Sequence, residues 1–342
     1  TAASPVIMTS LPDVTNTQVD PINAHREWAG LIVLGRAPIR GCNTAVAQGS
    51  VDCQNGVEGV LSGTGSNALY GGATANDNSG RITYLQIRYP GAFLTSATAG
   101  DDLNGLTLGG VGSATVINHV QVHNSGDDGI EIFGGAVDLK HVIITGAEDD
   151  SLDCDEGWAG KVQFLIVRQR SISATVPDRL IECSNRTVSS LAGTLNTSPT
   201  IANFTFIGAA GTGQGISLNN SGGSPGATAR LVNGVVTNAN VCLAADAAAA
   251  VPVLNSILFN CASAYGAPAQ TAITAGTNVS TGTASTLTSI FVNGANETAV
   301  TALDPATIDP FFTSTSWIGA VRNSSDTWWQ SWSCGLAAGS TC

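Results

Sequence analysis

The sequence has little charge. Only 11% of its 342 residues are Asp, Glu, Lys or Arg, against roughly 25% in typical soluble domains. Lysine occurs only at Lys140 and Lys161, and the formal net charge is −12. Because proteins hold a phosphate backbone with clustered positive charge, no nucleic-acid partner is expected.

Long hydrophobic runs are also missing. Hydrophobic residues make up 43% of the chain, but no stretch approaches the ~20 apolar residues that a membrane-spanning helix needs. They recur instead in short groups between Gly, Thr, Ser and Asn. We therefore expect a protein that does not span a membrane and that has extended β structure around a large core.

Short strand-like segments repeat along the chain in two series. The first series has segments that open at Asn104, Asp128 and Asp150, at steps of 24 and 22 residues. Each reads polar, small, apolar, polar, apolar. Further members are expected at Asn55 and Gln214, about two and three steps away.

The second series has the same period. Its segments open at Ile117, Leu139 and Val162, at steps of 22 and 23 residues. More widely spaced members open at Ile82, Ile201 and Leu231.

A repeat this short cannot bury its apolar side chains alone, so it must stack on its neighbours. Leucine-rich repeats share the period but need an LxxLxLxxN spacing, and propeller blades need about 40 residues. The sequence therefore predicts an all-β right-handed parallel β-helix of about 22–24 residues per coil and some ten to twelve coils. The expected divisions are an N-terminal cap (1–30), the coils (31–310) and a Trp-rich, disulfide-bonded C-terminal cap (311–342).

The eight cysteines are even in number, and none lies in a CxxC pair, so a zinc site is not expected. Sequence alone does not determine how they connect. Because distant parts of an elongated fold never meet, the expected pairs are sequence neighbours. These are Cys42 with Cys53, Cys154 with Cys183, Cys242 with Cys261, and Cys334 with Cys342.

Four disulfides indicate an oxidising compartment, and the chain starts at Thr1 without a signal-peptide pattern. We therefore expect a mature secreted protein that is extracellular or on the cell surface.

The acidic residues are concentrated, since ten of the 25 lie between Asp127 and Glu156. Parallel coils stack equivalent positions ~4.8 Å apart, so these carboxylates should gather on one face, with Glu58 in the same outward column. A bound Ca²⁺ would offset their repulsion, and the alternative is a solvated acidic face. The expected calcium ligands are Asp128, Glu131, Asp149, Asp150, Asp153 and Asp155.

A neighbouring outward column carries basic residues, among them His123 and Arg168. Carboxylates, a metal and an arginine on one face are the components of a polysaccharide lyase, and paired acids equally suit a glycoside hydrolase. No catalytic set is assigned, but an enzyme would use Asp127, Asp128, His123 and Arg168. A further column is expected to stack rather than to catalyse; it contains Tyr84, His119, His141 and Phe164.

Four strings and the Trp-rich ending carry a family resemblance. The strings are residues 28–38 (WAGLIVLGRAP), 104–112 (NGLTLGGVG), 125–135 (SGDDGIEIFGG) and 148–157 (EDDSLDCDEG). Together they resemble a large family of secreted bacterial parallel β-helix proteins, mostly known as hypothetical or cell-surface proteins. The resemblance covers nearly the whole chain and implies a fold and a location, but no activity.

The pairs Asp127–Asp128 and Asp149–Asp150 are also similar to polygalacturonase-type β-helices. That family's Gly-His-Gly loop and its Arg-x-Lys are missing here, which counts against hydrolase chemistry.

Two hypotheses of different classes remain. In the favoured one, the protein is a non-catalytic structural or adhesive β-helix, stabilised by calcium, that self-assembles into a surface layer or filament, since weakly charged surfaces repel one another little. In the other, it binds or cleaves a cell-surface polysaccharide at the acidic face between Asp127 and Asp155.

Overall fold

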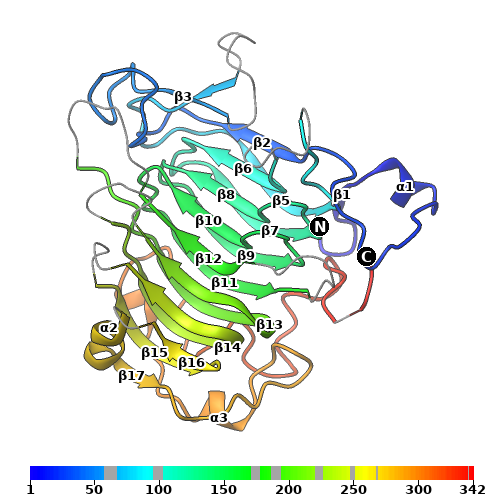
Figure 1. Cartoon of the computed structure of the whole chain (residues 1–342), viewed down its shortest axis with the longest axis vertical. Coiled ribbons are helices and arrows are strands. Elements are labelled where there is room, and N and C mark those ends of the chain that lie inside the picture. Colours follow the sequence, from blue (N-terminus) through cyan, green and yellow to red (C-terminus); the bar gives the residue numbers. More distant parts are fainter. Residues whose placement is uncertain are drawn as a thin grey trace.

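The computed structural model describes residues 1–57, 68–94, 103–170, 178–185, 194–219, 226–246, 251–266, 269–337 and 339–342. Fifteen strands form one continuous sheet whose named strands all pair in parallel, and the sheet winds into stacked coils (Figure 1). The predicted right-handed parallel β-helix is therefore confirmed. No described helix is long and apolar enough to cross a membrane.

Each coil contributes to two columns of strands. The short-strand column contains β2 (Leu31–Leu34), β6 (Leu106–Gly109), β8 (Ile130–Phe133), β10 (Leu152–Asp155), β12 (Arg179–Cys183), the second halves of β13 (Thr200–Leu218) and β14 (Arg230–Ala245), and β16 (Ser263–Tyr265). The long-strand column contains β1 (Val6–Met8), β5 (Arg81–Arg88), β7 (Val116–His123), β9 (Asp138–Thr145), β11 (Lys161–Arg168), the first halves of β13 and β14, β15 (Val253–Asn260) and β17 (Thr277–Ser280).

The predicted register of the repeats is confirmed in the long-strand column. Ile117 lies opposite Leu139, and Leu139 lies opposite Val162. The alternate side chains of these strands point inward, as in Leu85 and Ile87 of β5, and join one continuous buried core. Nine strands stack in this column of the described chain, slightly fewer than the expected ten to twelve coils.

Of the two outlying members of the first repeat series, Asn55 was assigned wrongly, whereas Gln214 belongs to the series but lies fewer steps away than expected. Asn55 and Gly56 form β3 (Asn55–Gly56), which pairs antiparallel with β4 (Leu69–Tyr70) outside the coils. The partner of β6 in the stack is β2 instead. Between Asp150 and Gln214 there are two steps rather than three, because β12 supplies a longer coil on which the second half of β13 stacks.

All four predicted disulfides are present. Cys154 and Cys183 lie directly opposite each other on β10 and β12 and are fully buried in the core. The Cys42–Cys53 bridge holds a segment that packs Ile39 against Phe133 and Tyr70 at one end of the short strands.

The helices of the described residues are short and lie outside the coils. They are α1 (Leu11–Val14), α2 (Gln270–Ala275), α3 (Ala295–Thr298) and one 3₁₀ helix at Pro305–Thr307. Residues 262–285 contain β16, α2 and β17. Ala272 of α2 and the preceding Ala269 join the core near Leu254, so α2 covers part of its far end.

Each strand of the long-strand column except β1 bends at a left-handed residue. The residues at this position include Tyr84, His119, His141 and Phe164, with φ between 55° and 62°, and then Asn203 and Asn233. Left-handed backbone is uncommon for aromatic residues, whereas asparagine tolerates it. The four rings stack in sequence at centroid distances of 4.4, 4.3 and 4.9 Å, as predicted.

The C-terminal segment, residues 286–342, runs back along the side of the long-strand column. Leu303 contacts Asn233 of β14, Thr313 contacts Gln163 of β11, and Cys334 contacts Gln121 of β7. Trp328 and Trp332 of this segment cover the stacked rings. The chain therefore ends beside its own beginning (Figure 1). The division into caps and coils stays a prediction, but the Trp-rich tail lies along the coils rather than over their far end.

Three buried amides clamp this segment. The side chains of Gln121, Gln163 and Asn233 each donate to one backbone carbonyl of the segment and accept from the N–H of the same residue. For Gln163 the two bonds to Thr313 measure 2.8 and 2.7 Å. Each side-chain amide thus makes the pair of hydrogen bonds that a residue of a neighbouring strand would otherwise make with the segment.

We expect Gln163→Leu to lower the free energy of unfolding by about 2–4 kcal/mol, because the N–H and carbonyl of Thr313 lose their partners. Gln330→Leu makes the same chemical change at an exposed position and should leave stability nearly unchanged. Urea unfolding measures both. Equal losses of unfolding free energy in the two variants would contradict the role of Gln163 as a clamp.

Candidate metal site

Eight carboxylates form a regular grid on the outward face of three adjacent short strands. We call these residues the acidic grid: Asp127, Asp128 and Glu131 at β8, Asp149, Asp150 and Asp153 at β10, and Asp178 and Glu182 at β12. Glu131 lies opposite Asp153, which lies opposite Glu182. Since Leu152 and Cys154 point into the core, the intervening Asp153 must point outward.

The grid brings carboxylate oxygens together in four overlapping groups, each with its oxygens within 4.8 Å of one another. Two groups share Asp128, and two equivalent groups one coil further along share Asp150. The groups are Asp127–Asp128–Asp149, Asp128–Glu131–Asp153, Asp149–Asp150–Asp178 and Asp150–Asp153–Glu182. Such groups can hold a metal ion, because hard divalent cations bind through carboxylate oxygens.

Asp128 is one of the buried members of the grid, together with Glu131 and Asp150. Its side chain is only 6% exposed, and its Oδ1 accepts a 2.9 Å hydrogen bond from the backbone N–H of Asp150. Burial raises its pKa well above the ordinary value, and the negative charges of Asp153, Glu131 and Asp127 raise it further. The site is therefore costly to ionise without a cation.

A neutral oxygen lies beside these carboxylates. Asn104 precedes β6, on the coil before that of Asp128, and its side-chain amide donates to Glu131. Its Oδ1 is buried and has no hydrogen-bond partner among the described residues. A carbonyl oxygen on the coil adjacent to Asp128 and Glu131 would extend the set of ligand atoms that a calcium-sized ion could use.

Arg179 closes the grid on the β12 side. It occupies the column position that Asp128 and Asp150 hold on the preceding coils, and its Nη1 lies 2.7 Å from Asp178, 2.9 Å from Glu182 and 3.6 Å from Asp150. Burial acts against its charge, but these three carboxylates outweigh burial and raise the pKa of Arg179. The β12 end of the grid therefore carries its own cation.

Five of the six predicted calcium ligands belong to these groups. The sixth, Asp155, is in none of the groups found among the described residues. It lies opposite Phe133 near the other end of the strands, where its Oδ1 accepts from the N–H of Glu156. Glu58 lies outside the described residues.

Asp178 and Glu182 were not predicted. Residues 178–182 (DRLIE) match the spacing of 127–131 (DDGIE) and 149–153 (DDSLD), so the acids at the first and fifth positions are a signal that could have found them. The long gap before this coil obscured its register.

His123 and Arg168 lie in different surroundings from the grid. His123 is buried, and its Nδ1 lies 2.8 Å from Thr145 Oγ1. Burial, together with Arg170, Arg88 and Arg168, lowers its pKa to about 3, so the ring is neutral. Arg168 reaches the carbonyl of Leu336 in the C-terminal segment. The described contacts thus do not join these two residues to Asp127 and Asp128 in one site.

Comparison with known proteins identifies a family. A family model described as a pectate-lyase-like beta helix domain matches residues 1–332. Neither a curated protein nor a solved structure matches the chain.

The raised pKa of Asp128 predicts how stability depends on pH when divalent cations are chelated. The folded state retains a proton that the unfolded chain has already lost, so stability should fall as the pH rises above about 4 through the raised pKa. In Asp128→Asn this decline should be shallower, and the variant should be more stable than wild type at pH 7 by on the order of 1 kcal/mol.

Urea unfolding between pH 4 and pH 8 in chelator provides the measurement, and Asp52→Asn, at an exposed position, is the matched control. A wild-type stability that rises over this range, or an Asp128→Asn variant that follows the same curve, would refute the account.

Proposed function

The chain belongs to the family of pectate-lyase-like β-helix domains, and we propose that it binds an acidic polysaccharide through a divalent cation, calcium, held on the acidic grid. The observation that carries the proposal is the grid itself, eight carboxylates from three coils around buried Asp128 and Asp150. A cation is needed on such a surface before a polyanion can approach it.

The grid offers both ligands for an ion and access to it. Asp128 and Asp150 lie beneath the surface, whereas Asp149 and the side chain of Asp178 are exposed at the rim. An ion held by Asp128, Glu131 and Asp153 would keep part of its coordination open to a uronate carboxylate. The cation would thereby bridge the negatively charged polymer and the negatively charged protein.

A polar hollow continues the grid along the coils. It has a volume of about 350 Å³, and Arg179, Gln214, Ser217, Asn219 and Asp246 line it together with residues of β14. Amides, hydroxyls and a guanidinium are the groups that hydrogen-bond to sugar hydroxyls. The hollow would accommodate a neighbouring sugar of a chain that lies along the axis.

Binding is favoured over cleavage because the carboxylates of the grid serve as ligands of the proposed cation, and Arg179, the basic residue beside them, is not suited to accept a proton. A lyase needs a group that accepts the proton removed from the sugar. Arg179 is the basic residue at the grid, but its three carboxylate partners raise its pKa and hold its proton more tightly. His123, which was predicted as a catalytic candidate, lies under the C-terminal segment.

We place the protein outside the cytoplasm. Four disulfides tie the coils and the tail, and such bonds persist in oxidising compartments. An extracellular location also brings the grid into contact with cell-surface polysaccharide and with calcium.

We expect wild-type protein to bind calcium and, in its presence, polygalacturonate. Glu131→Gln and Asp153→Asn each remove one ligand charge and should weaken calcium binding at least about tenfold. Asp52→Asn should leave it unchanged. Calorimetry measures the metal affinity, and polymer retention is compared with and without chelator.

Equal calcium affinity in Glu131→Gln and Asp52→Asn, or polymer retention that ignores the chelator, would contradict the proposal. Release of unsaturated or reducing sugars would show that the site cleaves its ligand.

We also propose, as a second function, the self-assembly that the sequence favoured, through the ends of the coils. Among the described strands, β1 and β17 each pair on one side only, and Val6 and Ile7 of β1 are exposed. Open strand edges can pair with another copy of the chain. Self-association would line up the grids of successive copies.

If β1 supplies such an interface, Ile7→Lys should shift the sedimentation of the wild-type protein from assemblies towards the monomer, since an edge lysine opposes pairing. Val253→Lys, at an exposed site on β15, is the control. Wild-type protein that sediments as a monomer at all concentrations, with calcium present, would exclude self-assembly.

A further inference from the structure

A cavity of about 490 Å³ lies between the coils and both chain ends, away from the acidic grid. Its floor is formed where β7, β9, β11 and the first half of β13 end. Ile22 and Asn23 of the N-terminal segment form one wall, and the loop closed by Cys334–Cys342 forms another. This volume is within the ~300–1,000 Å³ of small-molecule sites.

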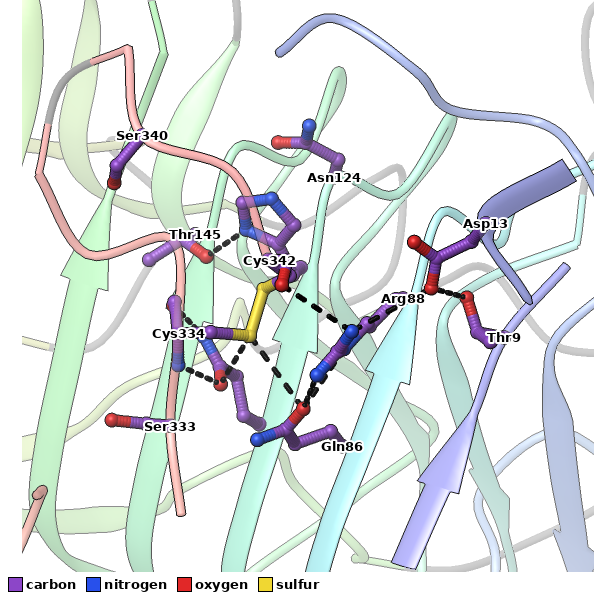
Figure 2. Close-up of a disulfide and its surroundings, with 12 residues drawn as sticks. Thr9, Asp13, Gln86, Arg88, Asn124, Thr145, Ser333, Cys334, Ser340 and Cys342 are labelled. Atoms are coloured by element: carbon purple, nitrogen blue, oxygen red, sulfur yellow. Dashed lines mark hydrogen bonds and ion pairs between the residues drawn. A yellow bond between two sulfur atoms is a disulfide. The ribbon is translucent and has the colours of Figure 1, made fainter. Parts of the chain in front are cut away.

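The disulfide loop is fitted closely to the floor. Gly335 of the loop packs on the ring of His123, where a β-carbon would come within 2.3 Å of Cε1. Figure 2 shows the bridge above β7, with Thr145 and Asn124 on the coil side and Ser340 on the loop. Arg88 reaches from β5 to the carbonyl of Cys342 and anchors the loop end.

The cavity is basic although the chain is acidic. Arg168 and Arg170 line it, and no Asp or Glu is among its described lining residues. Arg170 pairs with Glu148 at 3.4 Å, whereas Arg168 has no acidic partner within 4 Å among the described residues and contacts a carbonyl of the loop at 3.5 Å. About one positive charge therefore remains for a ligand.

Several buried polar atoms at this cavity have no hydrogen-bond partner among the described residues. They are Nε2 of Gln169, Nε and Nη1 of Arg170, and Nε2 of His123. Gln169 and His123 are each 3% exposed, and Arg170 is 8% exposed. Leaving buried donors unpaired is costly, so an arrangement of several around one cavity indicates a ligand that accepts hydrogen bonds.

We propose that this cavity binds a small carboxylate, of the size of one sugar acid, through Arg168, Arg170 and Gln169. A guanidinium matches the planar geometry of a carboxylate, and the single uncompensated charge suits a monoanion better than a doubly charged phosphate. Asn124, Thr145, Asn238 and Ser340 around the cavity supply partners for hydroxyl groups.

The test is calorimetry with galacturonate on the whole chain in chelator, so that cation-dependent binding at the grid does not contribute. Wild type should bind galacturonate with a Kd of about 1 mM or below, and it should not bind galactose, which lacks the carboxylate. Arg168→Gln should weaken binding at least about tenfold. Arg230→Gln, which removes the same charge at an exposed position, should leave it unchanged.

Ala337→Trp provides a second variant that keeps every charge. Ala337 is exposed but lines the cavity, so the larger side chain should block the mouth and abolish binding while unfolding in urea stays as in wild type. Absence of galacturonate binding to wild type, equal binding by Arg168→Gln, tighter binding of sulfate than of galacturonate, or equal binding of galactose would each overturn the proposal.

Discussion

The constraint on which this structure depends is the in-register stacking of parallel coils. Each coil places the same position of the repeat directly over that of its neighbour, so one side-chain type accumulates along a whole column. Apolar columns become the core, the aromatic bend column becomes a stack of four rings, and the acidic columns become a grid of carboxylates. Stacking therefore creates both the stability of the molecule and its largest electrostatic cost.

The repulsion between the carboxylates is relieved differently at different coils of the grid. At β12 the chain replaces the repeated acid with Arg179, which contacts three carboxylates. On the coil of β8, the equivalent position is Asp128, which is buried among like charges and beside the amide of Asn104. A bound divalent cation would do at Asp128 what Arg179 does for the equivalent group at Asp150, one coil further along. The proposed function follows from this difference.

The sequence predicted features that depend on the repeat and missed those that depend on tertiary contacts. The alternation in residues 117–122 and 139–144 showed both period and register, and cysteines close in sequence had to pair within an elongated fold. The return of the C-terminal segment was not predictable from the repeat, because it rests on amide clamps from Gln121, Gln163 and Asn233 that contact residues far along the chain. The coil at Asp178 was missed because insertions disturbed its spacing. His123 and Arg168 were grouped with the acids because the two columns are adjacent in sequence. In the structure, the C-terminal segment covers His123 and Arg168.

The most direct test of the central claim, that the grid holds a cation, is a crystal grown with manganese in place of calcium and measured for anomalous scattering. The account predicts a peak bounded by the carboxylates of Asp128, Glu131 and Asp153, near the side chain of Asn104. A map in which these carboxylates are surrounded by water alone, with no anomalous peak at the grid, would contradict it.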